Sequence, residues 1–162
     1  FKGTVEENLK MAKPDATKEE MEAVLQKVNL LGFLQTQDGL QTQLLEKASN
    51  LSGGQCQRLV IARALLRTDS AVYIFDEAAS NIDVESEELI MDVIHEIAKT
   101  KTVLLISHRL ANVVKSDQIY FLKDGEIKES GKHDELMSQN GAYRHLYESQ
   151  MALENYGKGG VA

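Results

Sequence analysis

Apolar and polar residues follow two different periods along this chain of 162 residues, and the period changes near residue 50. Over residues 17–28 the apolar positions recur at intervals of three and four, the spacing of one face of an amphipathic helix. Two later runs, AVYIF at 71–75 and TVLLI at 102–106, are short and almost continuously apolar. Such runs are typical of buried parallel strands. Because helical spacing flanks and separates them, residues from about 52 onward predict an α/β layered core.

Three helix starts carry the capping-box spacing, in which Ser or Thr is followed three residues later by Glu or Gln. The pairs are Thr4 with Glu7, Thr17 with Glu20, and Ser52 with Gln55. Another helix is expected from Asp83, because acidic residues follow in its first turn. Asp124-Gly125 predicts a β-hairpin, and two short helices are expected around Gly141.

Composition and charge limit the class of protein. Hydrophobic residues make up 43% and charged residues 27% of the chain, as in ordinary globular domains. The formal net charge is −7, and a chain this acidic without a basic tract is a poor candidate for binding nucleic acid. Cys56 is the single cysteine, so no disulfide can form within the chain. The apolar runs are too short to span a bilayer, and no secretory signal is visible.

Two adjacent carboxylates, Asp76 and Glu77, come directly after the first predicted strand. In α/β proteins, ligands bind at the carboxyl ends of the strands. Asp76 would lie close to the sheet edge, where it can hold Mg²⁺ directly or through water. Glu77 could orient or deprotonate an attacking water. An acidic pair also ends many strands without any such role, and the pair alone does not separate the two interpretations.

His108 occupies the equivalent place after the second predicted strand. A lone histidine is more often structural than functional. Its matched position favours a functional interpretation, because two parallel strands would bring Asp76, Glu77 and His108 to one edge of the sheet. A neutral imidazole there could hydrogen-bond a γ-phosphate or the attacking water.

The segment Ser52-Gly53-Gly54-Gln55 stands in front of a long and largely apolar helix. Exposed N–H groups and the positive end of the helix dipole favour an anion there. The glycines allow close backbone approach, and the Ser52 hydroxyl can cap the helix or donate to a phosphate oxygen, but not both at full strength. The alternative for this segment alone is a capping box with a flexible entry.

These three groups of residues, in this order, resemble the ATP-binding cassette (ABC) family. LSGGQ at 51–55 matches the signature motif of that family, and VYIFDE at 72–77 matches its Walker B strand with the catalytic glutamate. SNID at 80–83 is similar to its D-loop, and SHR at 107–109 to its H-loop. GTVEENL at 3–9 resembles the segment after the Q-loop in exporter-type members. The resemblance extends over almost the whole chain.

The resemblance implies the distal half of a RecA-like P-loop NTPase core, with parallel strands, helices and a C-terminal hairpin, plus an α-helical subdomain. The phosphate loop G-x-x-x-x-G-K-[ST] does not occur in the sequence, nor do the aromatic A-loop and the Q-loop glutamine. We therefore expect part of a nucleotide-binding domain. The helical subdomain and the approach to the signature motif would occupy residues 1–50, and the motif-bearing core with the C-terminal helices would occupy 51–162. Cys56 stands where family members usually carry a basic residue.

The mechanism of the family implies roles for three of these residues. Asp76 would hold Mg²⁺ through its water shell, Glu77 would polarise the attacking water, and His108 would contact the γ-phosphate of ATP. These roles imply an ATPase domain of an exporter-type ABC transporter. The chain by itself should not hydrolyse ATP, because the phosphate-loop lysine is missing.

The resemblance also implies partners. Ser52, Gly53, Gly54 and Gln55 would close on the γ-phosphate of an ATP held by a second nucleotide-binding domain, identical or different. Asp83 would communicate across that interface. A transmembrane domain of the same transporter would place the chain at the cytoplasmic face of the cell membrane. Uncovered strand surface further predicts that the chain associates with itself.

Two alternatives stay open at this point. One is a soluble ABC-family ATPase of the DNA-repair or ribosome-acting kind, although the long insertions usual in those proteins are not visible. The other is a non-enzymatic interaction module that binds a partner without a phosphate loop.

Overall fold

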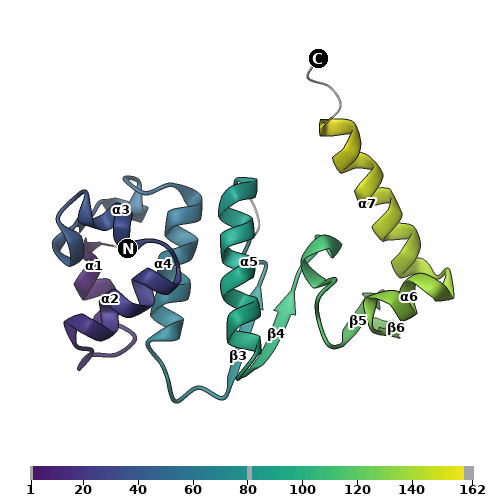
Figure 1. The fold of residues 1–162 in the computed structure, drawn as a ribbon, viewed down its shortest axis with the longest axis horizontal. Helices are drawn as coiled ribbons and strands as arrows, with labels where there is room; N and C mark the ends of the chain where they lie inside the picture. The colour runs from purple at the N-terminus through teal and green to yellow at the C-terminus, as the bar shows by residue number, and fades with distance from the viewer. Residues whose placement is uncertain (1, 80–81, 159–162) are drawn as a thin grey trace. The chain divides into compact units, whose positions relative to one another are not determined.

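The computed structural model describes residues 2–79 and 82–158 and divides into two compact units, Phe1–Leu104 and Leu105–Ala162 (Figure 1). The first unit holds, in order, β1 (Gly3–Thr4), α1 (Val5–Lys10), α2 (Lys18–Lys27), α3 (Leu31–Gln35), β2 (Gln43–Leu44), α4 (Gly53–Leu65), β3 (Val72–Asp76), α5 (Val84–Ala98) and the start of β4 (Thr102–Ile106). Short 3₁₀ turns lie at Gly39–Gln41 and Glu46–Ala48. The second unit holds a 3₁₀ turn (Leu110–Val113), β5 (Ile119–Lys123), β6 (Glu126–Gly131), α6 (His133–Gln139) and α7 (Ala142–Lys158).

The division between the two units lies at Leu104–Leu105, and the boundary expected near residue 50 falls inside the first unit and stays a prediction. Helix α2 packs against α4, so the predicted helical part and the signature helix share one unit. Among the described helices, none combines the length and the apolar character that a bilayer crossing needs.

The first two helices begin where the capping-box spacing predicts. The Thr4 Oγ1 accepts a hydrogen bond from the Glu7 N–H at 3.1 Å, and the Glu7 carboxylate accepts one from the Thr4 N–H at 2.8 Å. Thr17 and Glu20 make the same pair of bonds at the start of α2. Each pair satisfies two N–H groups that the helix itself leaves without a partner. Both predicted starts are confirmed.

A common core joins helices α1 to α4, which Figure 1 draws side by side. Its fully buried side chains come from each of these helices: Val5, Leu9, Leu25, Leu34 and Leu59 are 0% exposed. The face of α2 that the spacing predicts to be apolar is buried, which confirms that prediction. The burial of this face, rather than helix propensity, is what stabilises so short a helix.

Strands β3 and β4 form a two-stranded sheet and are connected through α5. The N–H of Thr102, the first residue of β4, donates to the carbonyl of Ala71, just before β3, at 3.2 Å. The two strands therefore start side by side and run parallel, with α5 as the crossover. This confirms the predicted α/β arrangement.

The prediction that both strands are buried is wrong. Tyr73 and Phe75 are buried, but Val72 and Ile74 are 54% and 65% exposed, and Leu104 of β4 is 49% exposed. Successive side chains of a strand point to opposite faces, so one face of this sheet is covered and the other is open. An apolar run records the hydrophobicity of both faces, but it does not guarantee that neighbouring elements cover both.

The second unit is built on the predicted hairpin. Strands β5 and β6 pair antiparallel with Lys123 opposite Glu126. Asp124 and Gly125 between them have φ of 54° and 78°, as the common two-residue hairpin turn requires.

Helices α6 and α7 complete this unit. Asn140 adopts a left-handed conformation with φ of 54° and ends α6. Helix α7 is longer than the short helix expected after Gly141. Apolar residues of the hairpin, the 3₁₀ turn and both helices form the core: Leu110, Val113, Ile119, Leu136 and Tyr143.

Candidate functional site

The start of α4 carries the segment that the sequence singles out for phosphate binding. The Ser52 Oγ accepts a hydrogen bond from the Gln55 N–H at 3.2 Å, and the Gln55 Oε1 accepts one from the Ser52 N–H at 2.8 Å. The capping box is therefore formed, as the alternative interpretation of this segment predicts. In this bond the Ser52 hydroxyl is the acceptor, and its own proton remains available to a second acceptor. The cap is therefore observed, and donation of the Ser52 hydroxyl to a phosphate oxygen stays a prediction.

The two glycines at the start of α4 differ in their exposure to solvent. Ser52 and Gly53 are exposed, whereas Gly54 is buried. Helix N–H groups in the first turn have no carbonyl partner within the helix. With the positive end of the helix dipole, they make this end suitable for an anion.

Gly54 is buried because the start of α5 lies against it. A Cβ built on Gly54 would lie 2.2 Å from the Ser86 Oγ and 3.5 Å from the Asp83 Oδ2. Only a residue without a side chain permits this approach. The structure thus brings the signature segment and Asp83, two predicted site elements 29 residues apart, into one place.

Asp83 is held as the N-cap of α5. Its Oδ1 accepts a hydrogen bond from the Ser86 N–H at 2.9 Å. This hydrogen bond lowers the pKa of the Asp83 carboxyl, and the Ser86 hydroxyl and the charge of Arg58 act in the same direction. The Arg58 guanidinium is itself fixed by the carbonyls of Gly54, at 3.3 Å, and Asn29, at 2.9 Å. Asp83 is therefore kept as an anion next to the start of α4.

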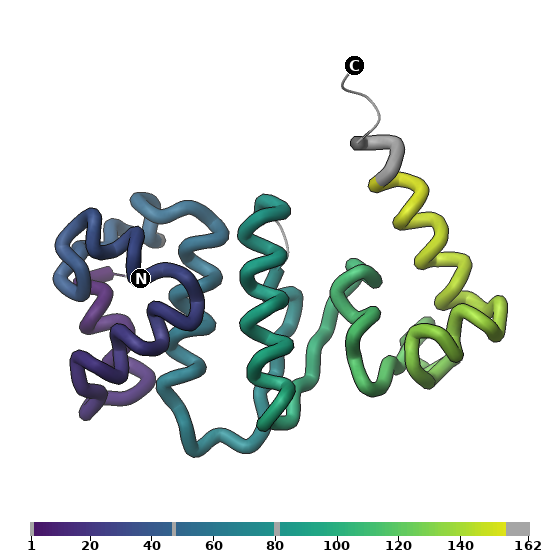
Figure 2. The backbone as a smooth tube through the Cα atoms, in the orientation of Figure 1, coloured from purple at the N-terminus to yellow at the C-terminus, as the bar shows by residue number. Residues whose placement is uncertain are grey.

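Asp76 and Glu77 lie at the carboxyl end of β3, which the chain reaches after leaving α4 (Figure 2). Both residues are exposed. Glu77 has a φ of 47°, a left-handed conformation that is uncommon for a residue with a side chain. This conformation ends β3 at Asp76. Glu77 therefore does not continue the alternation of side chains between the two faces of the strand.

His108 belongs to the second unit, whereas the other predicted site residues belong to the first. Its carbonyl accepts a hydrogen bond from the Gln150 Nε2 at 2.7 Å. The Gln150 Oε1 accepts another from the Leu110 N–H at 2.9 Å. One side chain of α7 therefore holds the backbone on both sides of Arg109, and the conformation of the segment after β4 depends on α7.

Cys56 follows the signature segment, where a basic residue is usual in the resembling family. Its Sγ lies 3.8 Å from the Ala48 carbonyl oxygen, and burial raises the pKa of the thiol. The side chain therefore stays a neutral thiol near neutral pH and does not replace the missing positive charge.

Two residues that position the predicted site residues, Ser86 and Gln150, were not predicted from the sequence. Ser86 stands three residues after Asp83, which is the spacing of an N-cap contact, so this signal was available. Gln150 is 40 residues from Leu110, and no local pattern indicates that contact. Ser80 and Asn81 of the predicted D-loop lie outside the described residues.

The side chains that can ligate a metal ion decide whether the chain could hold Mg²⁺. In the described part of the chain, no group of three or more His, Cys, Asp or Glu side chains gathers in a way that could hold a metal. Mg²⁺ bound with nucleotides typically uses only one or two carboxylates, with phosphate oxygens and water as the other ligands. Asp76, exposed at the strand end, fits the role of one such carboxylate.

Comparisons with known proteins agree on one family. A family profile described as ABC transporter matches residues 2–80. An uncharacterized ABC transporter ATP-binding protein of Haemophilus influenzae is 53% identical over 154 residues, 95% of this chain and 27% of that protein. An ATP-dependent lipid A-core flippase of Mannheimia succiniciproducens is 43% identical over 93% of this chain and 26% of its own length.

A solved structure gives the same result for the fold. The structure of a bacterial Atm1-family ABC exporter with ATP bound matches with a TM-score of 0.83 and 30% identity, over 93% of this chain and 26% of that chain. The chain thus spans 26% to 27% of the length of these relatives.

Proposed function

Because the chain belongs to the ABC transporter family, we propose that it is part of the nucleotide-binding domain of an exporter-type transporter and contributes one half of a composite ATP site. The observation that carries this proposal is the contact of Gly54 with Ser86 and Asp83, which joins the start of α4 to the start of α5. It supports a single surface that offers both a phosphate-binding helix start and an anionic cap. The mainly exporter-type relatives support the transport role.

In the proposed site the start of α4 binds the γ-phosphate of an ATP whose other phosphates are held by a second domain. The Ser52 O–H would donate a hydrogen bond to a phosphate oxygen, while its oxygen continues to accept the hydrogen bond from the Gln55 N–H. The N–H groups of Gly53 and Gly54 add the positive end of the helix. The two capping-box hydrogen bonds hold Ser52 and Gln55 in place, so little ordering of this segment would accompany binding.

The carboxylates after β3 supply the chemistry. Asp76 would hold Mg²⁺, which neutralises charge that develops on the phosphates. Glu77 would accept a hydrogen bond from the attacking water and orient it. His108 would donate to the γ-phosphate, with Gln150 fixing its backbone. Asp83, whose lowered pKa keeps it charged, would report the state of the site across the domain interface.

The proposed partners supply the parts of the ATP site and of the transporter that this chain does not contain. A second nucleotide-binding domain would supply the phosphate-loop lysine for the ATP that Ser52 contacts. A transmembrane domain at the cytoplasmic face of the membrane would convert the joining and separation of the two domains into export. The soluble ATPase and the non-enzymatic module remain the competing proposals.

A chimera tests the proposal. The matching segment of the Haemophilus influenzae relative, 53% identical, is replaced by this chain, and phosphate release is measured with the purified product. We expect ATP hydrolysis that falls by at least about 100-fold in Glu77→Gln, the usual size of a general-base contribution. Glu85→Gln, which neutralises an exposed carboxylate in the first turn of α5, is the control and should keep full activity.

The isolated chain provides the complementary measurement. Without a phosphate-loop lysine it should release no phosphate, and turnover that disappears in its own Glu77→Gln variant would refute the composite site. A chimera that is folded and binds ATP, but whose turnover is absent with this chain in place, would favour the non-enzymatic module.

A further inference from the structure

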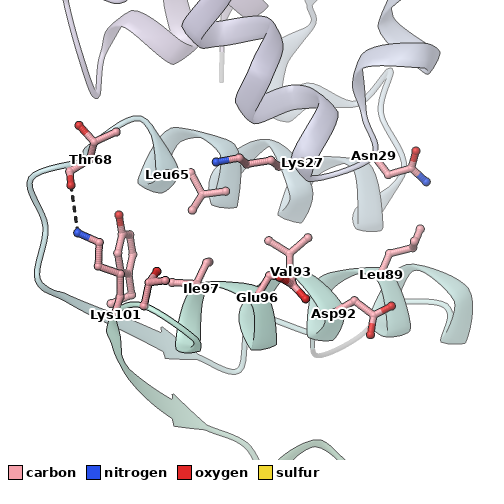
Figure 3. A pocket seen from close by; sticks show the side chains of 12 residues that line it. Lys27, Asn29, Leu65, Thr68, Leu89, Asp92, Val93, Glu96, Ile97 and Lys101 are labelled. Carbon is pink, nitrogen blue, oxygen red and sulfur yellow. Dashed lines mark hydrogen bonds between the residues drawn. The ribbon is translucent and has the colours of Figure 1, made fainter.

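A groove of about 510 Å³ lies in the first unit, between α5 on one side and α2 and α4 on the other (Figure 3). Its charged lining residues are two lysines and two acids: Lys27, Lys101, Asp92 and Glu96. The charges of the groove therefore select no occupant. A more specific arrangement lies in the second unit, where α7 meets the segment that follows β4.

One face of α7 carries the residues that contact this segment. They are three or four residues apart, which places them on one side of the helix: Tyr143, Tyr147, Gln150 and Glu154. Tyr143 is 0% exposed, and Tyr147 packs against the same core, which includes Leu110. The first half of this face is therefore buried, and the polar second half continues toward the residues just before Leu110.

Gln150 uses both ends of its carboxamide in this contact. Its Nε2 donates to the His108 carbonyl at 2.7 Å, and its Oε1 accepts a hydrogen bond from the Leu110 N–H at 2.9 Å. One planar group makes both bonds, so the distance between the two bonded backbone groups is fixed while the bonds persist. The peptide units on either side of Arg109 are therefore held together.

Two further contacts close the same turn. The Ser107 Oγ accepts a hydrogen bond from the Arg109 N–H at 3.1 Å. The Arg109 Nη2 lies 3.1 Å from the Glu154 Oε1, one turn of α7 beyond Gln150. The side chains of this ion pair are 35% and 38% exposed, so solvent screens the pair and it should contribute less than Gln150 does.

The start of α7 is itself fixed. The Glu129 carboxylate of β6 accepts hydrogen bonds from the Ala142 N–H at 2.5 Å and the Tyr143 N–H at 3.2 Å. The Tyr143 hydroxyl lies 2.8 Å from the His133 Nδ1. Gln150 follows Ala142 by eight residues, about 12 Å along the helix. The helix therefore presents Gln150 to the turn from an anchored base.

The His108 side chain is exposed, whereas its backbone is held by α7. The direction in which an exposed side chain leaves the chain depends on the backbone that carries it. A contact to a reacting group needs the side chain to be placed to within about 0.5 Å. The bonds from α7 act on the backbone that determines this placement.

We propose that α7 positions His108 for ATP hydrolysis, with Gln150 as the main positioning residue and Glu154 as its support. This rests on the proposed function, in which His108 donates to the γ-phosphate. Both residues act through the backbone of the turn. A displacement of about 1 Å at a reacting group can cost about 100-fold in rate. Loosening α7 should lower kcat and leave KM for ATP nearly unchanged, because the phosphate loop would supply most of the ground-state binding.

The chimera with the Haemophilus influenzae relative measures the effect on turnover. Gln150→Ala should lower kcat by at least about tenfold and change KM for ATP by less than about twofold. Glu154→Gln should lower kcat by at most about fivefold, the factor for an exposed ion pair. Gln139→Ala, the same change at an exposed position of α6, is the control and should keep full turnover. Added to His108→Ala, Gln150→Ala should cause no further loss, whereas a purely structural role would add its own.

Hydrogen exchange of the isolated chain tests the contact without nucleotide. The Leu110 amide should lose at least about fivefold of its protection in Gln150→Ala, the factor for one hydrogen bond, and keep it in Gln139→Ala. Gln150→Glu keeps the acceptor for the Leu110 N–H but loses the donor to the His108 carbonyl. It should therefore protect Leu110 and still lower kcat as Gln150→Ala does.

Several results would overturn the proposal. In an active chimera these are an unchanged kcat in Gln150→Ala, an equal loss in Gln139→Ala, or full turnover in Gln150→Glu. Unchanged exchange of Leu110 in Gln150→Ala would also overturn it. A chimera without turnover before any of these substitutions counts against the proposed ATP site, whereas the exchange measurement fails only if α7 does not hold this segment. The two failures are therefore distinguishable.

Discussion

Gly54 at the start of α4 lies so close to Ser86 of α5 that a Cβ on the glycine would come within 2.2 Å of the serine hydroxyl. At this point the backbone of α4 therefore packs directly against the Ser86 side chain of α5. Any side chain at position 54 must push them apart.

Gly54→Ala should lower the free energy of unfolding by about 1–3 kcal/mol, the usual cost of overpacking. Urea unfolding followed by circular dichroism measures this loss. Gly32→Ala is the control, because a Cβ on Gly32 meets nothing within 4 Å. Ser86→Gly should recover part of the loss when combined with Gly54→Ala, since it removes the colliding atoms. Strictly additive effects of the two changes would contradict the close contact.

Ser52→Ala should remove the capping box of α4 and cost about 1 kcal/mol of stability. The hydroxyl accepts the Gln55 N–H at 3.2 Å, and alanine leaves this group without its acceptor. Ser52→Thr keeps the hydroxyl and serves as the control. Hydrogen exchange of the first turn of α4 is the measurement, and equal protection in the alanine and threonine variants would show that the cap does not stabilise the helix.

Cys56 should react slowly with iodoacetamide in the folded chain at pH 8. Burial raises the pKa of this thiol, so the folded state favours the neutral form. The corresponding stabilisation is present below the pKa of the unfolded chain and is lost as pH rises through the higher folded-state pKa. Reaction rates measured by mass spectrometry from pH 7 to 10 should therefore rise at a higher pH for the folded chain than for the chain in urea. Coincident profiles would contradict the effect of burial.

Tyr143→Phe should destabilise the second unit by about 1 kcal/mol, the net value of one hydrogen bond. The Tyr143 hydroxyl lies 2.8 Å from the His133 Nδ1, and its ring packs edge-on against Phe121. Tyr143→Ala removes the ring as well, and a loss of about 3–5 kcal/mol is expected. Hydrogen exchange of β5 and β6 reports the change within this unit. Similar losses for both variants would mean that the ring contributes little.

The isolated chain should associate with itself through the open face of the β3–β4 sheet. Val72, Ile74 and Leu104 are exposed there, and apolar strand surface of this kind favours association. Ile74→Lys should weaken association by at least about tenfold, because a charge would be buried at the contact. Sedimentation velocity over a range of concentrations measures it, with Leu153→Lys on exposed α7 as the control. A particle that stays monomeric at every concentration would contradict this prediction.

Local signals predicted most of the elements, because caps and turns depend on neighbours in the sequence. The hydroxyl-to-Glu or Gln spacing located three helix starts, and Asp124-Gly125 located the hairpin. Burial was harder to predict, since the apolar run at 71–75 does not indicate which elements cover each face of the strand. Packing across long separations was not predictable at all: the contact of Gly54 with Ser86 and the bonds of Gln150 depend on how helices meet.

The left-handed backbone conformation of Glu77 affects how a substitution at this position would change the stability of the chain. A residue with a side chain at φ of 47° is strained by about 1 kcal/mol, and glycine would relieve this strain. Glu77→Gly should therefore make the chain more stable while removing the proposed catalytic carboxylate. With the proposed catalytic role of Glu77, stability and turnover would favour different residues at this position.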